Sequence, residues 1–221
     1  MAPRKVFAQE LESLRQDIIQ MGAEVEELVK QTIIAITTRD KDLAKKVIEK
    51  DDYIDQVEVE IERRCVTLIA HQQPLARDLR LIMSILKIVT DMERIADQCE
   101  DICMYSLQLQ DESWSHEEAY KRHIENMAID VQGMLKRAID GFVEKDVVKM
   151  REICKYDDKI DADFKRIWQE IVEEMGCNKE FIPKGADYLM IIKYFERIAD
   201  HTTNIAEWLI YNVTGDIRFS E

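Results

Sequence analysis

Glu93-Arg-Ile-Ala-Asp97 and Glu196-Arg-Ile-Ala-Asp200 are two copies of one five-residue stretch, 103 positions apart. Each copy places a glutamate and an aspartate four residues apart, within a segment whose apolar residues recur at intervals of three and four. In an α-helix this spacing brings the two carboxylates to the same face, one turn apart. The sequence therefore predicts two similar helices, each carrying a pair of acids.

The residues that precede each copy also match between the two halves of the chain. A shift of 106 positions pairs Ile18 with Ile124, Asp40 with Asp146, Asp51 with Asp157, Ile54 with Ile160 and Asp55 with Asp161. Self-similarity over most of a chain is the signature of an internal repeat. The change of shift from 106 to 103 falls near Pro74 and near 176–185, where turn residues allow loops of different length.

Apolar periodicity predicts three long helices in the first half, at about 4–39, 41–71 and 75–107. Asp40 is placed to cap the second helix, and Pro74 ends it. With the repeat, the expected fold is all-α: six long helices forming two tandem antiparallel three-helix bundles. We expect the bundles to comprise residues 1–110 and 111–221, joined by the polar segment 108–116.

Composition restricts the partners. The net charge of −14 disfavours contact with nucleic acid and with anionic lipid. No apolar run reaches the length needed to span a membrane, and residues 1–10 lack the apolar core of a secretory signal. The odd number of cysteines indicates a cytoplasmic protein with reduced thiols. The five are expected to be small core residues: Cys65, Cys99, Cys103, Cys154 and Cys177.

Acid pairs four residues apart recur on two helices of each half. The eight candidate metal ligands are Asp51, Asp55, Glu93, Asp97, Asp157, Asp161, Glu196 and Asp200. Clustered carboxylates repel one another, and a bound cation offsets that repulsion. An all-oxygen set favours hard cations such as Mg²⁺, Ca²⁺, Mn²⁺ or iron over Zn²⁺. No histidine follows a glutamate by three residues, which argues against an oxygen-activating di-iron bundle.

Other interpretations of these acids stay open. A solvated acidic face would make the chain a plain helical interaction module without metal, whereas a metal-dependent phosphohydrolase would use the same carboxylates to activate water. The sequence has no phosphate-cradling glycine loop, nucleophile elbow or zincin motif. We expect Arg94 to form a salt bridge to the neighbouring bundle, and His201 to be a hydrogen-bonded boundary residue.

Longer stretches around the repeat resemble a known family. Asp91-Met-Glu-Arg-Ile-Ala-Asp97 and Tyr194-Phe-Glu-Arg-Ile-Ala-Asp-His-Thr-Thr-Asn-Ile-Ala-Glu207 are similar to the paired signatures of the PhoU family of bacterial phosphate-signalling regulators. The resemblance extends to Arg77-Asp-Leu-Arg80 and Val213-Thr-Gly-Asp216, and covers nearly the whole chain. After Asp97 the first signature departs from the second, and we expect the two metal sites to be unequal.

The resemblance implies a non-enzymatic cytoplasmic regulator that is commonly a homodimer. Members of the family restrain the phosphate-starvation response by linking a phosphate ABC transporter to a sensor histidine kinase. Their paired-acid motifs hold metal ions, in some members multinuclear iron or zinc clusters, and these motifs fall on the eight acids named above. The resemblance leaves the cation open among iron, zinc, magnesium and manganese.

Overall fold

The computed structural model describes residues 3–109 and 119–216, and this part of the chain is built from long helices with one short 3₁₀ turn. The elements are α1 (Pro3–Thr38), α2 (Lys41–Gln72), α3 (Ala76–Gln108), α4 (Ala119–Glu144), α5 (Val147–Cys177), η1 (Lys179–Phe181) and α6 (Ile182–Thr214). The predicted helices of the first half are confirmed to within one or two residues at each end. The predicted boundary at 110/111 lies outside the described residues.

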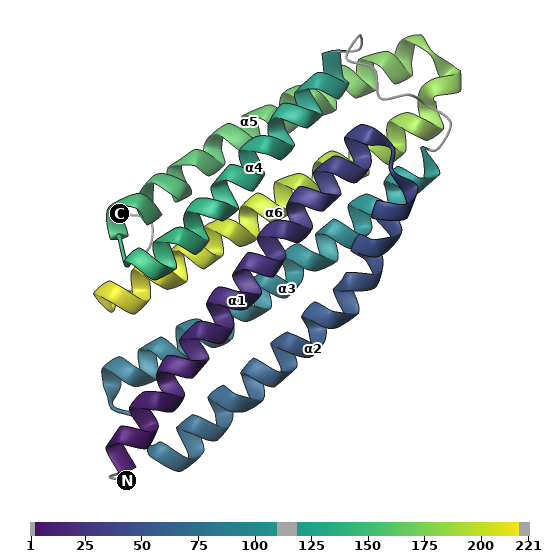
Figure 1. The fold of residues 1–221 in the computed structure, drawn as a ribbon. Helices are drawn as coiled ribbons and strands as arrows, with labels where there is room; N and C mark the ends of the chain where they lie inside the picture. Colours follow the sequence, from purple (N-terminus) through teal and green to yellow (C-terminus); the bar gives the residue numbers. More distant parts are fainter. Residues whose placement is uncertain (1–2, 110–118, 217–221) are drawn as a thin grey trace.

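The helices form two tandem three-helix bundles, α1–α2–α3 and α4–α5–α6, as predicted (Figure 1). α3 and α6 pack along one another at the centre, so the two helices that carry the repeated motif join the halves. α1 also packs against α4 across the same junction. The buried apolar side chains of both halves form one continuous core.

The turns before α2 and α5 show the internal repeat in atomic detail. The side chain of Asp40 accepts hydrogen bonds from the backbone N–H groups of Asp42 and Leu43, at 3.1 and 2.9 Å. Asp146 caps α5 in the same way. The residue before each cap, Arg39 or Lys145, is left-handed, with φ of 58° and 57°. Each cap satisfies backbone donors that the helix itself leaves free, which fixes where both helices begin.

Close packing at the junction of the halves explains the glycine inside α1. A Cβ at Gly22 would lie 3.2 Å from Met92 Cε and 3.3 Å from Ile139 Cγ1. The missing side chain lets α1 approach α3 and α4 together. The glycine therefore allows close packing between the helices, and α1 remains helical at this position.

The cysteine expectation is only partly right. Cys65, Cys99 and Cys103 are buried, but Cys154 is half-buried and Cys177 is exposed at the end of α5. Cys177 lies at the last residue of a helix, beyond the buried stripe that ends near Ile171. No helix among the described residues has both the length and the apolar character needed to cross a membrane.

Candidate metal centre

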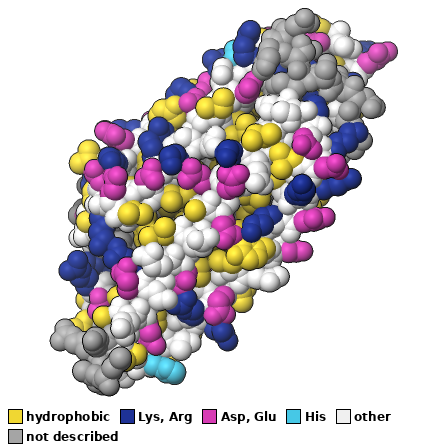
Figure 2. Space-filling view, viewed as in Figure 1, with side chains coloured by type: hydrophobic (Ala, Val, Ile, Leu, Met, Phe, Trp, Pro, Cys, Tyr) yellow, Lys and Arg dark blue, Asp and Glu magenta, His cyan; other side chains and the backbone are white. Residues whose placement is uncertain are grey.

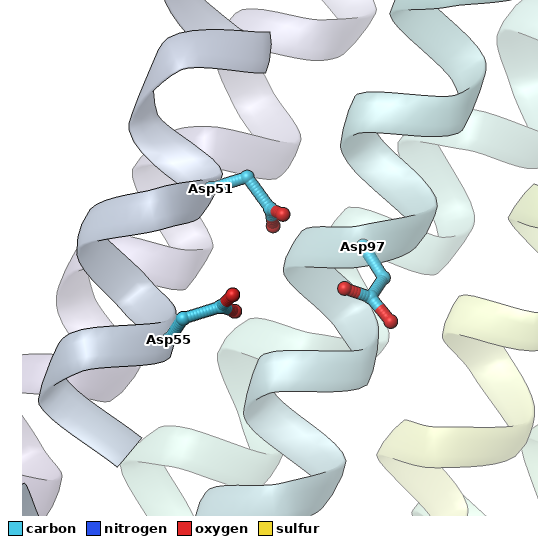
Figure 3. A group of neighbouring side chains, drawn as sticks. All are labelled: Asp51, Asp55 and Asp97. Atoms are coloured by element: carbon cyan, nitrogen blue, oxygen red, sulfur yellow. The ribbon is translucent and has the colours of Figure 1, made fainter. Parts of the chain in front are cut away.

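Three of the predicted acids meet where α2 packs against α3. Asp51 and Asp55 lie one turn apart on α2 and point toward Asp97 on α3 (Figure 3). One carboxylate oxygen from each lies within 4.8 Å of the others. The spacing of four residues places both α2 acids on the helix face that packs against α3, as the sequence predicts.

Several oxygens of this cluster are buried without a hydrogen-bond donor. They are Asp51 Oδ1, Asp55 Oδ1 and, beside them, Glu93 Oε2; none accepts a hydrogen bond from the described residues, although Arg94 Nε lies 3.3 Å from Glu93 Oε2. A buried acceptor without a partner costs about 1–3 kcal/mol, and more when the group is charged. The protein alone therefore leaves this cluster short of positive charge.

The raised pKa values of two carboxyls also indicate that the cluster lacks positive charge. Burial, followed by repulsion from Asp97 and Asp55, raises the pKa of Asp51 to about 7. Burial, followed by repulsion from Asp97 and Glu58, raises the pKa of Glu93 to about 7 as well. In neutral solution without a cation, these two carboxyls would bind protons for part of the time.

Arg94 does not reach the neighbouring bundle, so that prediction is wrong. Its Nη1 donates to Asp97 Oδ2 at 2.8 Å, and its Nε lies 3.3 Å from Glu93 Oε2 on the same helix. The guanidinium is half exposed and partly compensates the cluster from its rim. Residues three positions apart on one helix are close enough for this pairing, which needs no second bundle.

Sequence reasoning missed two acids beside the cluster. Glu58 follows Asp55 by three residues, and Glu100 follows Asp97 by three. Burial is the largest cause of the raised pKa of both carboxyls. The signal was available, because positions four and then three residues apart continue a single helix face.

The second half brings its acids near one another but supplies its own cations. The amine of Lys193 donates to Glu196, and Lys165 Nζ lies 3.7 Å from Asp161. Burial, then repulsion from Asp200, raises the pKa of Asp157 to about 6. Among the described residues, only the first half contains three acids whose oxygens converge as closely as those of a cation site.

The repeat explains this difference between the halves. The positions that correspond to Lys193 and Lys165 in the first half are Thr90 and Val59. Neither side chain carries a charge, so the first cluster has no lysine in the places where the second has two.

His201 lies at the junction of the two halves. Its Nδ1 is 2.9 Å from Asp91 Oδ1 on α3, and Asn204 Nδ2 donates to the same oxygen at 3.1 Å. The predicted hydrogen-bonded boundary position is therefore confirmed. Asp91 is not one of the eight predicted ligands, and its role here is to join α3 to α6.

The first cluster has the geometry of an oxygen-ligand cation site. Oxygens on opposite sides of a Ca²⁺ ion at 2.3–2.6 Å are separated by roughly 4.6–5.2 Å. One oxygen each from Asp51, Asp55 and Asp97 lies within 4.8 Å of the others, so no pair is too far apart to share one such ion. The unpaired oxygens of Asp51 and Asp55 and the all-carboxylate donor set fit a hard divalent cation.

The sequence profile of the PhoU domain matches residues 18–106 and 124–209, one match in each bundle. The chain belongs to the PhoU family. A homologue of the phosphate-specific transport system accessory protein PhoU from Clostridium acetobutylicum is 39% identical over 213 residues, covering 96% of each chain. The PhoU accessory protein of Escherichia coli is 34% identical over 210 residues, covering 95% of this chain and 86% of the relative.

Solved PhoU structures share the fold. The crystal structure of PhoU from Pseudomonas aeruginosa matches with a TM-score of 0.88 and 36% identity, covering 95% of this chain and 100% of the other. The phosphate transport system regulatory protein PhoU from Streptococcus pneumoniae matches with a TM-score of 0.85 and 32% identity, covering 96% and 98%. The arrangement of both bundles is thus shared with these two PhoU structures.

Proposed function

We propose that the chain is a non-enzymatic accessory regulator of phosphate uptake. The supporting observation is that relatives named as phosphate-specific transport system accessory proteins match 95–96% of the chain at 34–39% identity. In this proposal the protein is a cytoplasmic homodimer that links a phosphate ABC transporter to a sensor histidine kinase and restrains the phosphate-starvation response. The net charge of −14 suits partners that offer basic surfaces.

Affinity capture tests this role. Full-length tagged protein, incubated with the cytoplasmic portions of the transporter and the kinase from the same cell, is expected to retain both. Deleting the gene is expected to switch on a phosphate-starvation reporter in phosphate-rich medium. Failure to retain either partner, with an unchanged reporter, would remove the adaptor role.

We also propose that the carboxylate clusters hold divalent cations, most strongly in the first half. Asp51, Asp55 and Asp97 are the direct ligands in this proposal, and Glu93 completes the charge around them. The second-half acids Asp157, Asp161, Glu196 and Asp200 form a weaker site, because lysines already neutralise part of their charge. A bound cation would offset the mutual repulsion of the first cluster and hold α2 against α3.

Metal content after dialysis against Mg²⁺, Mn²⁺, iron or Zn²⁺ tests the site. Glu93→Gln and Asp97→Asn are expected to lower the bound metal per chain. Asp52→Asn is the matched control, because Asp52 is exposed on α2 directly beside Asp51. Equal metal content in all three variants would show that the ion, if one is bound, lies elsewhere.

One observation supports a second function. Carboxyls with a pKa of about 7, such as those of Asp51 and Glu93, are suited to take a proton from water beside a metal ion. A metal-dependent phosphohydrolase would therefore turn over phosphate esters when Mg²⁺ or Mn²⁺ is added. Turnover that Asp97→Asn abolishes would overturn the non-enzymatic proposal. A module without metal would instead show the same thermal midpoint with and without chelator.

A further inference from the structure

A cavity of about 570 Å³ lies away from the carboxylate clusters, at the end of the molecule where α1 and α3 begin and α6 ends. Elements from both halves line it, including Arg15 of α1, Arg80 of α3 and Asn212 of α6. Lys145, in the turn between α4 and α5, closes another side. The cavity is thus built only when the two bundles are packed together.

Cationic side chains dominate its lining. Arg15, Arg77, Arg80 and Lys145 face only two acids, Glu12 and Asp78. The excess of positive charge stands out in a chain with a net charge of −14. Figure 2 shows Lys and Arg side chains gathered at the edge of the molecule where α6 ends.

These cations have few partners in the protein. Within residues 3–109 and 119–216, Arg77, Arg80 and Lys145 form no ion pair. Arg15 has a loose contact with Glu12, at 3.9 Å between Nη1 and Oε2, and its guanidinium carbon lies 5.9 Å from the centre of the Phe142 ring. Their charge is therefore available to a ligand.

Two nitrogens of residues that line the cavity lack acceptors. Arg80 Nε and Asn212 Nδ2 are buried and have no hydrogen-bond partner in the described part of the chain. Unsatisfied buried donors are uncommon in folded proteins and call for an explanation. Because both groups are donors, the missing partner is an acceptor.

The C-terminal cap of α6 makes room for the guanidinium of Arg80. Gly215 has a φ of 78°, and a Cβ there would collide with Arg80 Nη1. Glycine therefore serves both the left-handed cap and the placement of the arginine.

The internal repeat does not require these cations. In the second half, the positions that correspond to Arg77 and Arg80 are occupied by Glu180 and Pro183. The three-helix bundle is therefore built in both halves, but the pair of arginines is present in only one. This separates the cationic cavity from the needs of the shared fold.

We propose that this cavity binds a small anion through its phosphoryl group. Arginine guanidinium groups match the oxygens of a phosphoryl group with two parallel hydrogen bonds, and lysine adds charge. The volume lies in the range of small-molecule sites and exceeds what orthophosphate alone needs. Leu11, Leu81 and Val213 form apolar walls that suit the organic part of a phosphate ester.

The phosphoryl group could come from free orthophosphate or from a phosphate ester, and calorimetry with the full-length protein separates the two. The titrants are orthophosphate, AMP and adenosine, at constant ionic strength set with sodium chloride. Excess chelator is present throughout, so the carboxylate clusters hold no metal and their failure as metal sites would not affect the result. We expect saturable binding of AMP or orthophosphate and none of adenosine. Adenosine binding as tight as AMP would overturn phosphoryl recognition, as would no binding of any titrant at millimolar concentration.

Variants locate the site. Arg80→Gln is expected to weaken binding by about tenfold or more, the loss typical of one hydrogen bond to a charged group. Arg77→Gln should weaken it as well and leaves the packing intact, because Arg77 is exposed. Arg63→Gln is the control, since that arginine is exposed on α2 and pairs with Glu60. Equal affinity in Arg77→Gln, Arg63→Gln and the unchanged protein would refute the proposal even if Arg80→Gln did not fold.

Discussion

Replacing Asp51 by asparagine should stabilise the metal-free protein at pH 8. The substitution keeps the size of the side chain and removes a charge that repels Asp97, Asp55, Glu100 and Glu93. The residue is only 8% exposed, so water screens the repulsion only from the side of its more hydrated neighbours. In the absence of a cation, the negative charge at this position opposes folding.

The raised pKa of Asp51 gives both the size and the sign of its effect on the free energy of unfolding. Raising the pKa of Asp51 from 3.8 to about 7 corresponds to about 4 kcal/mol at full strength. Because Asp55 and Asp97 remain partly hydrated, we expect about half of this destabilisation, or about 2 kcal/mol, in the free energy of unfolding. Because the folded pKa is the higher one, the native state binds more protons between pH 4 and 7. The penalty is absent below about pH 4, grows as the pH rises and is complete above about pH 7.

Thermal and urea unfolding in excess chelator measure the prediction. At pH 8, Asp51→Asn should raise the midpoint by roughly 4–8 °C for a chain of this size, and at pH 4 the two proteins should unfold alike. Saturation with a divalent cation should reverse the order. At a hundred times its Kd, an ion adds about 2.7 kcal/mol to the protein that binds it, and the variant has lost a ligand.

Asp52→Asn is the control for this experiment, because it removes the same charge from an exposed position on the same helix. Its midpoint should change little at either pH. If both variants respond alike at pH 8 in chelator, the buried repulsion does not exist and the argument for a cation loses its physical basis.

Three further predictions concern the two repeats. Asp40→Ala and Asp146→Ala should each lower the free energy of unfolding by about 1 kcal/mol in urea titrations, and no loss would mean that the caps are dispensable. Lys193→Gln frees the carboxylate of Glu196 and should increase the metal bound per chain after dialysis; unchanged content would exclude the lysine as the limiting factor. Thr90→Lys places an amine where the second half has one. It should stabilise the chelated protein at pH 8 and lower its metal content, and a stability gain without metal loss would separate the two effects.

Local signals in the sequence were sufficient for the helices. Capping aspartates, a proline after α2 and apolar intervals of three and four each act within a few residues, and the structure follows them closely. The repeat then extended the prediction to the second half, because Asp146 begins α5 in the same way that Asp40 begins α2. The fold class could be predicted because these signals agree with one another.

The way the two bundles dock could not be predicted. α3 meets α6 through Asp91, which accepts from His201 and Asn204. At the other end of the contact between α3 and α6, Asp101 interacts with Tyr194. Equivalent positions of the repeat therefore meet at both ends of the contact, but they carry different residues. No local pattern specifies this contact, because it depends on which faces remain apolar after each bundle has formed.

The fate of each acid depends on its neighbours in space more than on its motif. Both copies of Glu-Arg-Ile-Ala-Asp have the same five residues, and yet Glu196 is paired with Lys193 while Glu93 keeps a buried oxygen without a donor. The difference arises one turn before the motif, where Thr90 replaces the lysine. The duplication has thus preserved the acids and the arginine of the motif, but not the lysine one turn before it. Lysines pair with the acids of the second half, whereas Arg94 only partly compensates the first cluster from its rim, which is why we propose the first cluster as the better candidate for a metal centre.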